Sequence, residues 1–547
     1  MKKIKNKTTP IIIALILAFI GSSCNDKEVV GNTQPNIIVI LADDMRSDYL
    51  GSMGKNDIVQ TPNLDALAEK GILFENTFAT SASCTPNRTC LLSGMYERKH
   101  GVTFASRSAM TEEAFSRTYP MQLKKAGYYT GYVGKNHTPI GKSEKGFGYK
   151  SGRMEEMFDY WYAGHGHLTF YPKERHDIFA NAKADNQPNI IQEGVDNFFE
   201  QDPGFAGAKS FLQSRPKDKS FCLLVNFNVP HSSGTGSMEL RPEDPELYKS
   251  VYRDRIAEMP QPPTYVAHEE ISTPKLPVNV YNGKYIKSYN FVKTPDDLRE
   301  RQVRTCQTVT GIDMLTGKVI KELEKQGIAD NTIIIFTSDH GLQHGEHGLG
   351  GKMLLYEESI SVPLIIYAPG LSNGTIDELC LSIDLAPTIL ELAGIDADPE
   401  MQGISLLPLM KEEKTEWRED LFCENMFMGQ NYPRIEAVRS KEWKYIRYYS
   451  KDNDQHHILS LISPLLGEKA VYEELYDLRN DPSETKNVAD EPANSEILDK
   501  LRGRCDKLLK EAKGNARLPD TYIQDKKNPD IVTQAENKYQ ELVTIYK

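Results

Sequence analysis

The chain has 547 residues, of which 39% are hydrophobic and 26% are charged, so it can bury a large core spread over two or three domains. Ordinary apolar content without a short repeat or a long charge block excludes collagen, coiled coil and general disorder. The 65 basic and 77 acidic residues give a formal net charge of −12. This charge argues against a nucleic-acid-binding protein, which would carry a broad basic surface.

The first 23 residues have the pattern of an export signal. Four lysines between positions 2 and 7 precede an apolar run over 11–20, which is too short to span a bilayer. Small residues then lead to Cys24, as at the cleavage site of a bacterial lipoprotein. A plain secretory signal with an incidental cysteine is the alternative. We expect an exported protein, either periplasmic or an outer-membrane lipoprotein of a Gram-negative bacterium, that touches the membrane only through a lipid on Cys24.

Four short apolar runs, each followed by polar residues, form the main pattern between residues 36 and 338. The runs cover 36–42, 128–133, 221–227 and 332–338, and helical patterns lie between them at 63–71, 120–127 and 313–327. Continuous β-branched runs of this length are typical of parallel strands that are buried on both faces. Their alternation with helices predicts a large doubly wound α/β sheet, mainly parallel and flanked by helices, in a domain over 36–410.

Polar side chains follow each of the four runs, at the strand ends where ligands bind in such sheets. The carboxylates Asp43, Asp44 and Asp339 are expected at one edge, and crowded carboxylates repel one another unless a cation neutralises them. Oxygen ligands favour Ca²⁺ or Mg²⁺ over zinc. Basic residues near the same edge are Lys135, His137, His231 and Lys352. A divalent cation beside groups that transfer protons predicts a site for a tetrahedral oxyanion ester.

The segment 83–94, with the sequence SCTPNRTCLLSG, predicts a helix that starts near Pro86, because proline is tolerated in a first turn. Cys84 then lies at the helix N-terminus, where the helix dipole stabilises negative charge. Arg88 lies one turn further on and can point back toward it. The plain structural interpretation is a capped helix with a buried cysteine.

This segment resembles the C-x-P-x-R signature of the type I sulfatases, a family of the alkaline-phosphatase-like superfamily that includes gut-bacterial glycan sulfatases. Other marks of that family occur in the expected order along the chain. They are Asp43-Asp44, Gly134-Lys135-x-His137, Pro230-His231, Asp339-His340-Gly341, His347-Gly348-Leu349 followed by Lys352, and 474–478 followed by Asn480-Asp481-Pro482. The resemblance extends from about residue 36 to about residue 489.

The resemblance implies a cofactor made from the chain itself. In this family a maturation enzyme oxidises the signature cysteine, here Cys84, to formylglycine, whose hydrate is the nucleophile. The gem-diol keeps a second hydroxyl, and loss of its proton expels sulfate, whereas a serine or cysteine would stay sulfated. One Ca²⁺ ion is the implied metal. Its implied ligands are Asp43, Asp44, Asp339, His340 and the hydrate oxygen at position 84.

The resemblance also implies roles for the basic residues. Arg88 and Lys135 would orient the hydrate and offset its charge, and His137 would accept its proton. His231 would protonate the leaving sugar oxygen, and Lys352 would bind sulfate oxygens. Two positions depart from the family pattern: Asn87 stands where serine is commoner, and His340 stands in a place often filled by asparagine.

The substrate is predicted from less specific features. The stretch 141–216 departs from the strand–helix alternation and is rich in aromatic residues, which suits either a sugar ring or a covering loop packed by its own aromatics. His176 and Asp177 are the preferred sugar contacts, and 239–263 is expected to form another irregular wall. Because the net charge is acidic, a long groove for a polyanion is disfavoured. We therefore expect exo action on terminal sulfated galactose or N-acetylhexosamine of mucin-type or glycosaminoglycan chains.

Residues 411–547 predict a smaller α+β subdomain and a tail. Short strands are expected at 435–439, 443–449 and 474–478, in an antiparallel sheet, with an amphipathic helix at 495–513. Residues 514–547 are polar and either wrap back over the body or stay mobile.

Two other functions fit the same residues. A phosphonate monoester or phosphodiester hydrolase would use the same oxidised cysteine, because sulfate and phosphate have the same shape. A catalytically silent glycan-binding lipoprotein is disfavoured, because every matched catalytic position is retained.

Overall fold

The computed structural model describes ten segments of the chain and the single residues Asn537 and Glu541, and the segments include all of the predicted strands and helices. The segments are 34–104, 108–165, 207–231, 246–271, 292–349, 351–413, 416–427, 432–450, 460–514 and 521–523. The predicted signal over 1–23, Cys24 and the proposed sugar contacts His176 and Asp177 lie outside them. Among the described residues, no helix has both the length and the apolar character needed to cross a membrane.

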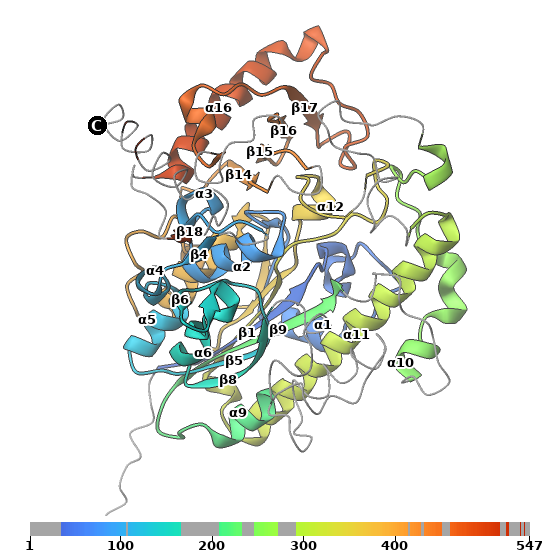
Figure 1. The fold of residues 1–547 in the computed structure, drawn as a ribbon. Coiled ribbons are helices and arrows are strands. Elements are labelled where there is room, and N and C mark those ends of the chain that lie inside the picture. The colour runs from blue at the N-terminus through green and yellow to red at the C-terminus, as the bar shows by residue number, and fades with distance from the viewer. Residues whose placement is uncertain are drawn as a thin grey trace, which may run out of the picture. The chain divides into compact units, whose positions relative to one another are not determined.

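An eight-stranded sheet forms the centre of the fold (Figure 1). In spatial order its strands are β12 (Gly374–Ile376), β2 (Ile72–Phe74), β11 (Leu364–Tyr367), β10 (Thr332–Ser338), β1 (Asn36–Asp43), β9 (Phe221–Pro230), β5 (Tyr129–Asn136) and β8 (Tyr160–His165). Of these eight, β11 alone runs against its neighbours. The predicted mainly parallel α/β sheet is therefore confirmed.

All four predicted strands are present in the centre of this sheet. Every residue of β1 is buried, as expected for a strand covered on both faces. The parallel register aligns Ala42 with Ser338 of β10 and Asp43 with Pro230 of β9. Strands β5 and β9 each continue about three residues past their predicted ends. Their polar ends thus belong to the sheet itself, which holds those side chains on rigid backbone.

Helices cover both faces of the sheet (Figure 1). One face packs against α1 (Pro62–Lys70), α9 (Ala208–Ser214) and α11 (Pro295–Lys325), and the other against α2 (Cys84–Ser93), α5 (Tyr119–Lys125) and α13 (Leu385–Leu392). Shorter elements are α3 (Glu97–His100), α4 (Glu112–Ser116), α6 (Arg153–Met157), α10 (Glu246–Lys249), α12 (Glu357–Ile360), α14 (Leu407–Met410), and the strand pairs β3 (Thr77–Phe78) with β13 (Cys380–Leu381) and β6 (Lys142–Ser143) with β7 (Gly146–Phe147).

The helix predicted at 313–327 is only the second half of α11. The helix begins at Pro295, where Thr294 and Asp297 form a capping box. Its first half was missed because polar and charged residues outnumber its apolar residues, which leaves too few apolar positions to show a helical period. Burial against the sheet stabilises this half instead, through residues such as Val303 and Val309.

The stretch 141–216 contains a strand that the sequence analysis did not predict. Strand β8 pairs in parallel with β5 at the edge of the sheet. Tyr162 is buried in the core, and the Trp161 ring stacks on Tyr132 with ring centroids 5.1 Å apart. These two aromatic residues therefore pack the fold, which agrees with the covering-loop interpretation rather than with a sugar-binding face.

The C-terminal region contains the predicted antiparallel sheet. Its strands are β14 (Asp420–Asn425), β15 (Ile435–Ser440), β16 (Trp443–Tyr448) and β17 (Tyr472–Asp477), and β14 was not predicted. Helix α16 (Ser495–Lys513) has the predicted bounds and lies beside this sheet (Figure 1). Its leucines pack against residues of the four strands. In the tail, β18 (Thr521–Ile523) pairs with β4 (Ser108–Met110) of the α/β part, so these tail residues return to it.

Candidate active site

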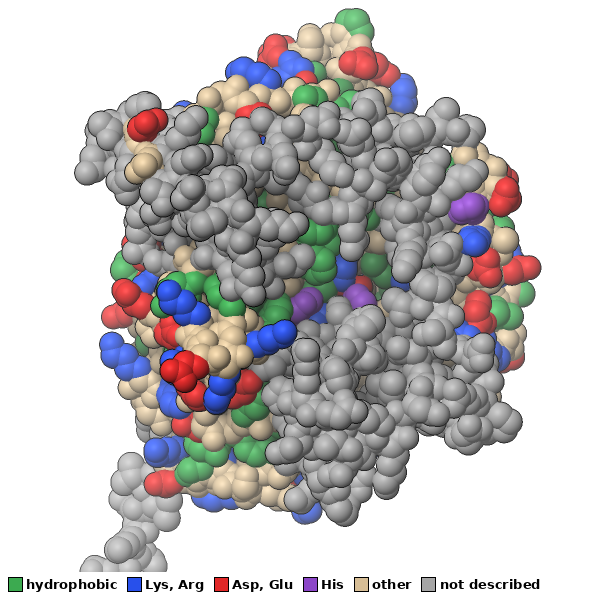
Figure 2. Space-filling model, viewed as in Figure 1, with side chains coloured by type: hydrophobic (Ala, Val, Ile, Leu, Met, Phe, Trp, Pro, Cys, Tyr) green, Lys and Arg blue, Asp and Glu red, His purple; other side chains and the backbone are tan. Residues whose placement is uncertain are grey.

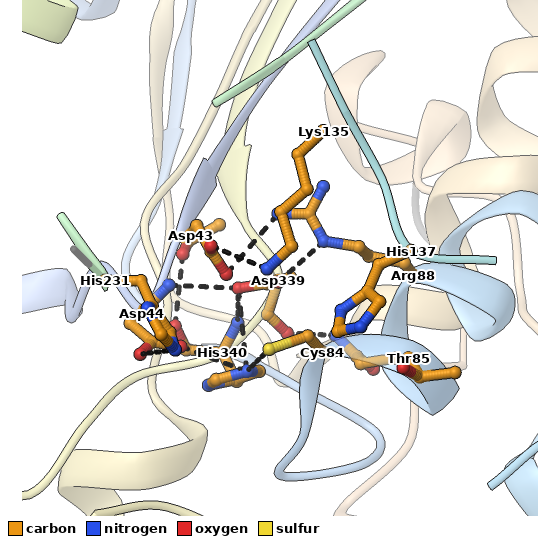
Figure 3. A network of polar contacts seen from close by, with 12 residues as sticks. Asp43, Asp44, Cys84, Thr85, Arg88, Lys135, His137, His231, Asp339 and His340 are labelled. Atoms are coloured by element: carbon orange, nitrogen blue, oxygen red, sulfur yellow. Dashed lines mark hydrogen bonds and ion pairs between the residues drawn. The ribbon is translucent and has the colours of Figure 1, made fainter. Parts of the chain in front are cut away.

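The structure brings all the predicted catalytic and metal-binding residues to one place, at the carboxyl ends of the central strands (Figure 3). Asp43 and Asp44 lie at the end of β1, Lys135 and His137 at the end of β5, His231 after β9, and Asp339 and His340 after β10. Cys84 and Arg88 are on α2. Lys352 lies on the loop that follows β10 and contacts Cys84. The predicted sugar contacts His176 and Asp177 lie outside the described residues.

Asp43 and Asp44 both reach the site because the chain turns sharply between them. Successive side chains of a strand point to opposite faces. Asp44 adopts a left-handed backbone conformation, with φ of 66°, that ends the strand and redirects its side chain. Its backbone N–H donates a hydrogen bond of 3.0 Å to Asp339 Oδ1. A strained backbone kept at this point agrees with a functional role for Asp44.

Four side chains form a compact donor set in which a metal ion fits. One ligand atom each of Asp43, Cys84, Asp339 and His340 lies within 4.8 Å of all the others, and all four residues are buried. Asp44 lies at the edge of this set, with its Oδ1 3.2 Å from His340 Nε2 and 2.9 Å from Lys352 Nζ. Two or three carboxylates with one imidazole favour a hard cation such as Ca²⁺.

The charges of the site also fit a divalent cation. Burial raises the pKa of Asp44 to about 7, although Lys352 and His340 act in the opposite direction. Burial would lower the pKa of His340, but Asp339, Cys84 and Asp44 raise it to about 9. The buried carboxylates therefore draw a proton onto a neighbouring imidazole, and a bound cation would supply that positive charge instead.

The orientation of His340 leaves one ring nitrogen facing the donor set. His340 Nδ1 lies 2.8 Å from the carbonyl oxygen of Gly341, and a carbonyl can only accept, so Nδ1 carries the proton. Nε2 then faces Cys84 Sγ at 3.1 Å. A histidine that donates one N–H to a carbonyl and turns the other nitrogen inward has the usual orientation of a metal ligand.

Cys84 is the first residue of α2, as predicted, and its thiol is surrounded by cations. Helix α2 is buried along its whole length, with Pro86 in its first turn. Lys352 Nζ lies 2.9 Å from Cys84 Sγ. Burial would raise the pKa of this thiol, but Lys135, Lys352 and His340 lower it to about 7. Residue 84 thus occupies a position that stabilises negative charge, as a nucleophile requires.

Arg88 and Lys135 are held by two carboxylates of the donor set. Arg88 Nε donates to Asp339 Oδ2 at 2.8 Å, and Lys135 Nζ lies 2.6 Å from Asp43 Oδ2. All of these side chains are at most 2% exposed. Because the contacts join each cation to an acid of the donor set, the two basic residues and the two carboxylates keep one another in place.

His137 and His231 lie on opposite sides of the donor set (Figure 3). Burial, Lys135 and Arg88 hold the pKa of His137 well below its usual range. Burial and Lys352 do the same for the pKa of His231, although Asp43 acts in the opposite direction. The surroundings of both imidazoles therefore favour the neutral form in the absence of substrate. On the face seen in Figure 2, histidine and basic side chains are visible at the bottom of a hollow.

Tyr149, which was not predicted as a site residue, contacts His137 through its ring and its hydroxyl. The two rings stack with centroids 5.6 Å apart, and the Tyr149 hydroxyl donates to the His137 carbonyl at 2.9 Å. The same hydroxyl lies 3.2 Å from Thr85 Oγ1 on α2. No pattern in the sequence marks this tyrosine, because it lies outside the regular strands and helices that position the predicted site residues.

Comparison with known proteins finds matches over most of the chain. A model of the sulfatase family matches residues 35–395, well over half of the chain, and a model of the C-terminal region of N-sulphoglucosamine sulphohydrolase matches residues 345–464. The chain is 27% identical over 544 residues to an N-acetylglucosamine-6-O-sulfatase of Bacteroides thetaiotaomicron, covering 88% of each protein. It is 27% identical over 536 residues to the N-acetylglucosamine-6-sulfatase of Homo sapiens, covering 93% of this chain and 91% of the relative.

Solved structures share the fold. A protein in complex with its substrate D-glucosamine-2-N,6-O-disulfate matches 89% of this chain and 99% of its own, with a TM-score of 0.64 and 24% identity. A phosphonate monoester hydrolase of Agrobacterium radiobacter matches 87% of this chain and 95% of its own, with a TM-score of 0.60 and 20% identity. The family match and the cluster around Cys84 agree: the chain belongs to the type I sulfatase family of the alkaline-phosphatase-like superfamily and is a sulfuric ester hydrolase.

Proposed function

We propose that this enzyme hydrolyses sulfate monoesters of carbohydrates, acting from the chain end on terminal sulfated N-acetylhexosamine or galactose of mucin-type or glycosaminoglycan chains. The observation that carries the proposal is the Cys84 thiol, held between Lys352 and His340 at the metal-binding cluster. The relatives named N-acetylglucosamine-6-sulfatase match along most of the chain, which favours 6-O-sulfated N-acetylglucosamine as the first substrate to test. The net charge of −12 disfavours a groove for a long polyanion.

The proposal includes conversion of Cys84 to formylglycine by a sulfatase maturation enzyme. The aldehyde hydrate supplies a nucleophilic oxygen together with a second hydroxyl, so that the enzyme is not left as a stable sulfate ester. The surroundings of residue 84 suit this chemistry, because Lys135 and Lys352 favour negative charge there. Lys352 would also bind the sulfate oxygens, since its Nζ contacts Asp44 of the cluster and its side chain remains 12% exposed.

The histidines are proposed to move the protons. His137 is neutral and lies beside Lys135 and Arg88, so it would accept the proton of the nucleophile. His231 would protonate the leaving sugar oxygen. It is neutral without substrate, and the negative charge of a bound sulfate group would raise its pKa and favour the protonated form.

We propose that a Ca²⁺ ion is held by Asp43, Asp44, Asp339 and His340, where it would supply positive charge to the reacting oxygens. A chelator should then abolish turnover and lower the melting temperature, because a ligand that binds only the folded state at about 100 times its Kd stabilises it by about 3 kcal/mol. Calorimetry with and without added Ca²⁺ measures the shift. The Asp339→Ala variant is the control and should show none, and equal melting temperatures for the wild type would contradict the metal assignment.

Sulfate release from a panel of sulfated mono- and disaccharides tests the activity, using protein shown by peptide mass to carry formylglycine at residue 84. We expect one regioisomer to be hydrolysed much faster than the others, and N-acetylglucosamine 6-sulfate is the first candidate. The panel should include a phosphonate monoester and a phosphodiester, because faster turnover of either would support the phosphonate or phosphodiester hydrolase instead. Binding of the sulfated sugars without release of sulfate would support the silent glycan-binding protein.

We further propose that the protein is exported, as a periplasmic or outer-membrane lipoprotein, and that a lipid on Cys24 is its contact with the membrane. The lysines, the apolar run and the small residues of 1–24 support this proposal. A location outside the cytoplasm would place the enzyme where sulfated glycans are available.

A further inference from the structure

Asn87 joins the nucleophile helix to the metal-binding strand end. It lies on α2, three residues after Cys84 and directly before Arg88, and it is fully buried. Its side-chain amide nitrogen donates a short hydrogen bond to the backbone carbonyl of Asp339. This residue belongs to the segment that carries the nucleophile, yet its side chain contacts a residue 252 positions away, at the end of β10.

The other end of the same amide is also bonded. Asn87 Oδ1 accepts a hydrogen bond of 2.7 Å from Ser382 Oγ, in the short helix η12 (Ser382–Asp384), and one of 3.2 Å from the Ser81 backbone N–H. Ser382 Oγ in turn accepts from the Thr80 backbone N–H at 3.0 Å. One side chain therefore links three segments around the first turn of α2, and its orientation is determined from both ends.

The carbonyl that Asn87 binds belongs to Asp339, whose side chain is also held by several hydrogen bonds. The Asp339 carboxylate accepts hydrogen bonds from Arg88 Nε and from the backbone N–H groups of Asp44 and His340. The Asp339 backbone N–H donates to the Ala42 carbonyl at 3.2 Å, and Asn87 binds the carbonyl on the other side of the same residue. A shift of this backbone would move both Asp339 and His340 away from Cys84.

We propose that Asn87 is a positioning residue that sets the spacing between the nucleophile helix and the metal ligands. The serine that is commoner at this position ends one bond closer to the backbone and has no separate donor and acceptor ends. It could not hold Asp339 and Ser382 at once with the contacts seen here. The inference rests on the proposed metal, and it concerns a position at which this chain departs from the family signature.

The test compares Asn87→Leu with Asn87→Ser and with Asn36→Leu. Leucine keeps the volume but leaves the Asp339 carbonyl buried without its donor, which a buried acceptor tolerates poorly. Asn36 is a matched control: it is a buried amide bonded to Thr332, at the opposite end of β1 from the site. Ca²⁺ affinity is measured by titration calorimetry on chelator-treated protein, and kcat and KM are measured at equal formylglycine content.

We expect Asn87→Leu to bind Ca²⁺ about tenfold more weakly and to lose about 100-fold in kcat with little change in KM. Asn87→Ser should lie between this variant and the wild type, and Asn36→Leu should bind Ca²⁺ as the wild type does. If a folded Asn87→Leu or Asn87→Ser protein bound Ca²⁺ as tightly as the wild type, the positioning role of Asn87 would be overturned, while the metal assignment would stand. Absence of Ca²⁺ binding by the wild type would instead overturn the metal assignment and this inference with it.

If Asn87→Leu does not fold, Asn87→Ser carries the test, because serine keeps a donor and is the residue that the family usually has. A loss of Ca²⁺ affinity in Asn87→Ser with an unchanged melting temperature of the metal-free protein would support positioning. An equal loss of Ca²⁺ affinity in Asn36→Leu would overturn it, because any buried amide would then have the same effect.

Discussion

Replacement of Cys84 by alanine, in a host that matures sulfatases, is expected to abolish turnover while the protein still folds. The residue is the precursor of the proposed nucleophile, and losses of about 10⁴-fold or more follow removal of a nucleophile. Cys84→Ser should be equally inactive if the maturation enzyme of the host acts only on cysteine. Sulfate release measures turnover, and circular dichroism and the melting temperature measure folding.

Cys90→Ala is the matched control for this substitution. Cys90 is on the same helix and equally buried, but its Sγ contacts His100 Nε2 at 3.3 Å and is not part of the donor set. Its removal should leave kcat nearly unchanged. The small cavity that it creates should lower the free energy of unfolding by on the order of 1 kcal/mol. Turnover by Cys84→Ala close to that of Cys90→Ala would refute the nucleophile assignment.

Replacement of Arg98 by methionine is expected to lower the free energy of unfolding by about 3–5 kcal/mol, the cost of breaking a buried ion pair from one side. Arg98 lies on α3, directly after the nucleophile helix, and its side chain is 0% exposed. It bonds Glu424 Oε2 at 2.5 Å on β14 and Glu436 Oε1 at 2.6 Å on β15. The variant leaves both buried carboxylates without this cation.

Urea denaturation measures the change, with Arg299→Met as the control. Arg299 pairs at 2.8 Å with Asp296, which is 93% exposed, and such surface pairs contribute less than about 1 kcal/mol. A similar small loss for Arg98→Met would show that the buried network does not stabilise the contact between α3 and the C-terminal sheet. We also expect Arg98→Met to reduce activity, because α3 follows the helix that carries Cys84.

The sheet was predictable because its strands are distinctive in sequence. Buried parallel strands have continuous apolar runs, and the runs at 36–42 and 332–338 match β1 and β10 closely. The first half of α11 and strand β8 were missed for the opposite reason. Their residues are polar or aromatic in no clear period, and burial against distant parts of the chain determines their structure.

The members of the site were predictable as residue types at strand ends, and the structure brings them together as expected. Their exact contacts could not be predicted from the sequence. The left-handed turn at Asp44, the stacking of Tyr149 on His137 and the bond from Asn87 to Asp339 each depend on backbone positions that no local pattern encodes.

Local patterns in the sequence predicted the class of fold, the helix that carries Cys84 and the set of acids and bases at the strand ends, because local propensity and strand burial leave periodic signals along the chain. The geometry of the candidate donor set, the charge around Cys84 and the link through Asn87 became visible only in the folded structure. These join residues about 250 to 300 positions apart, such as Asp44 with Asp339 and Lys352 with Cys84, so they exist only after the sheet has assembled.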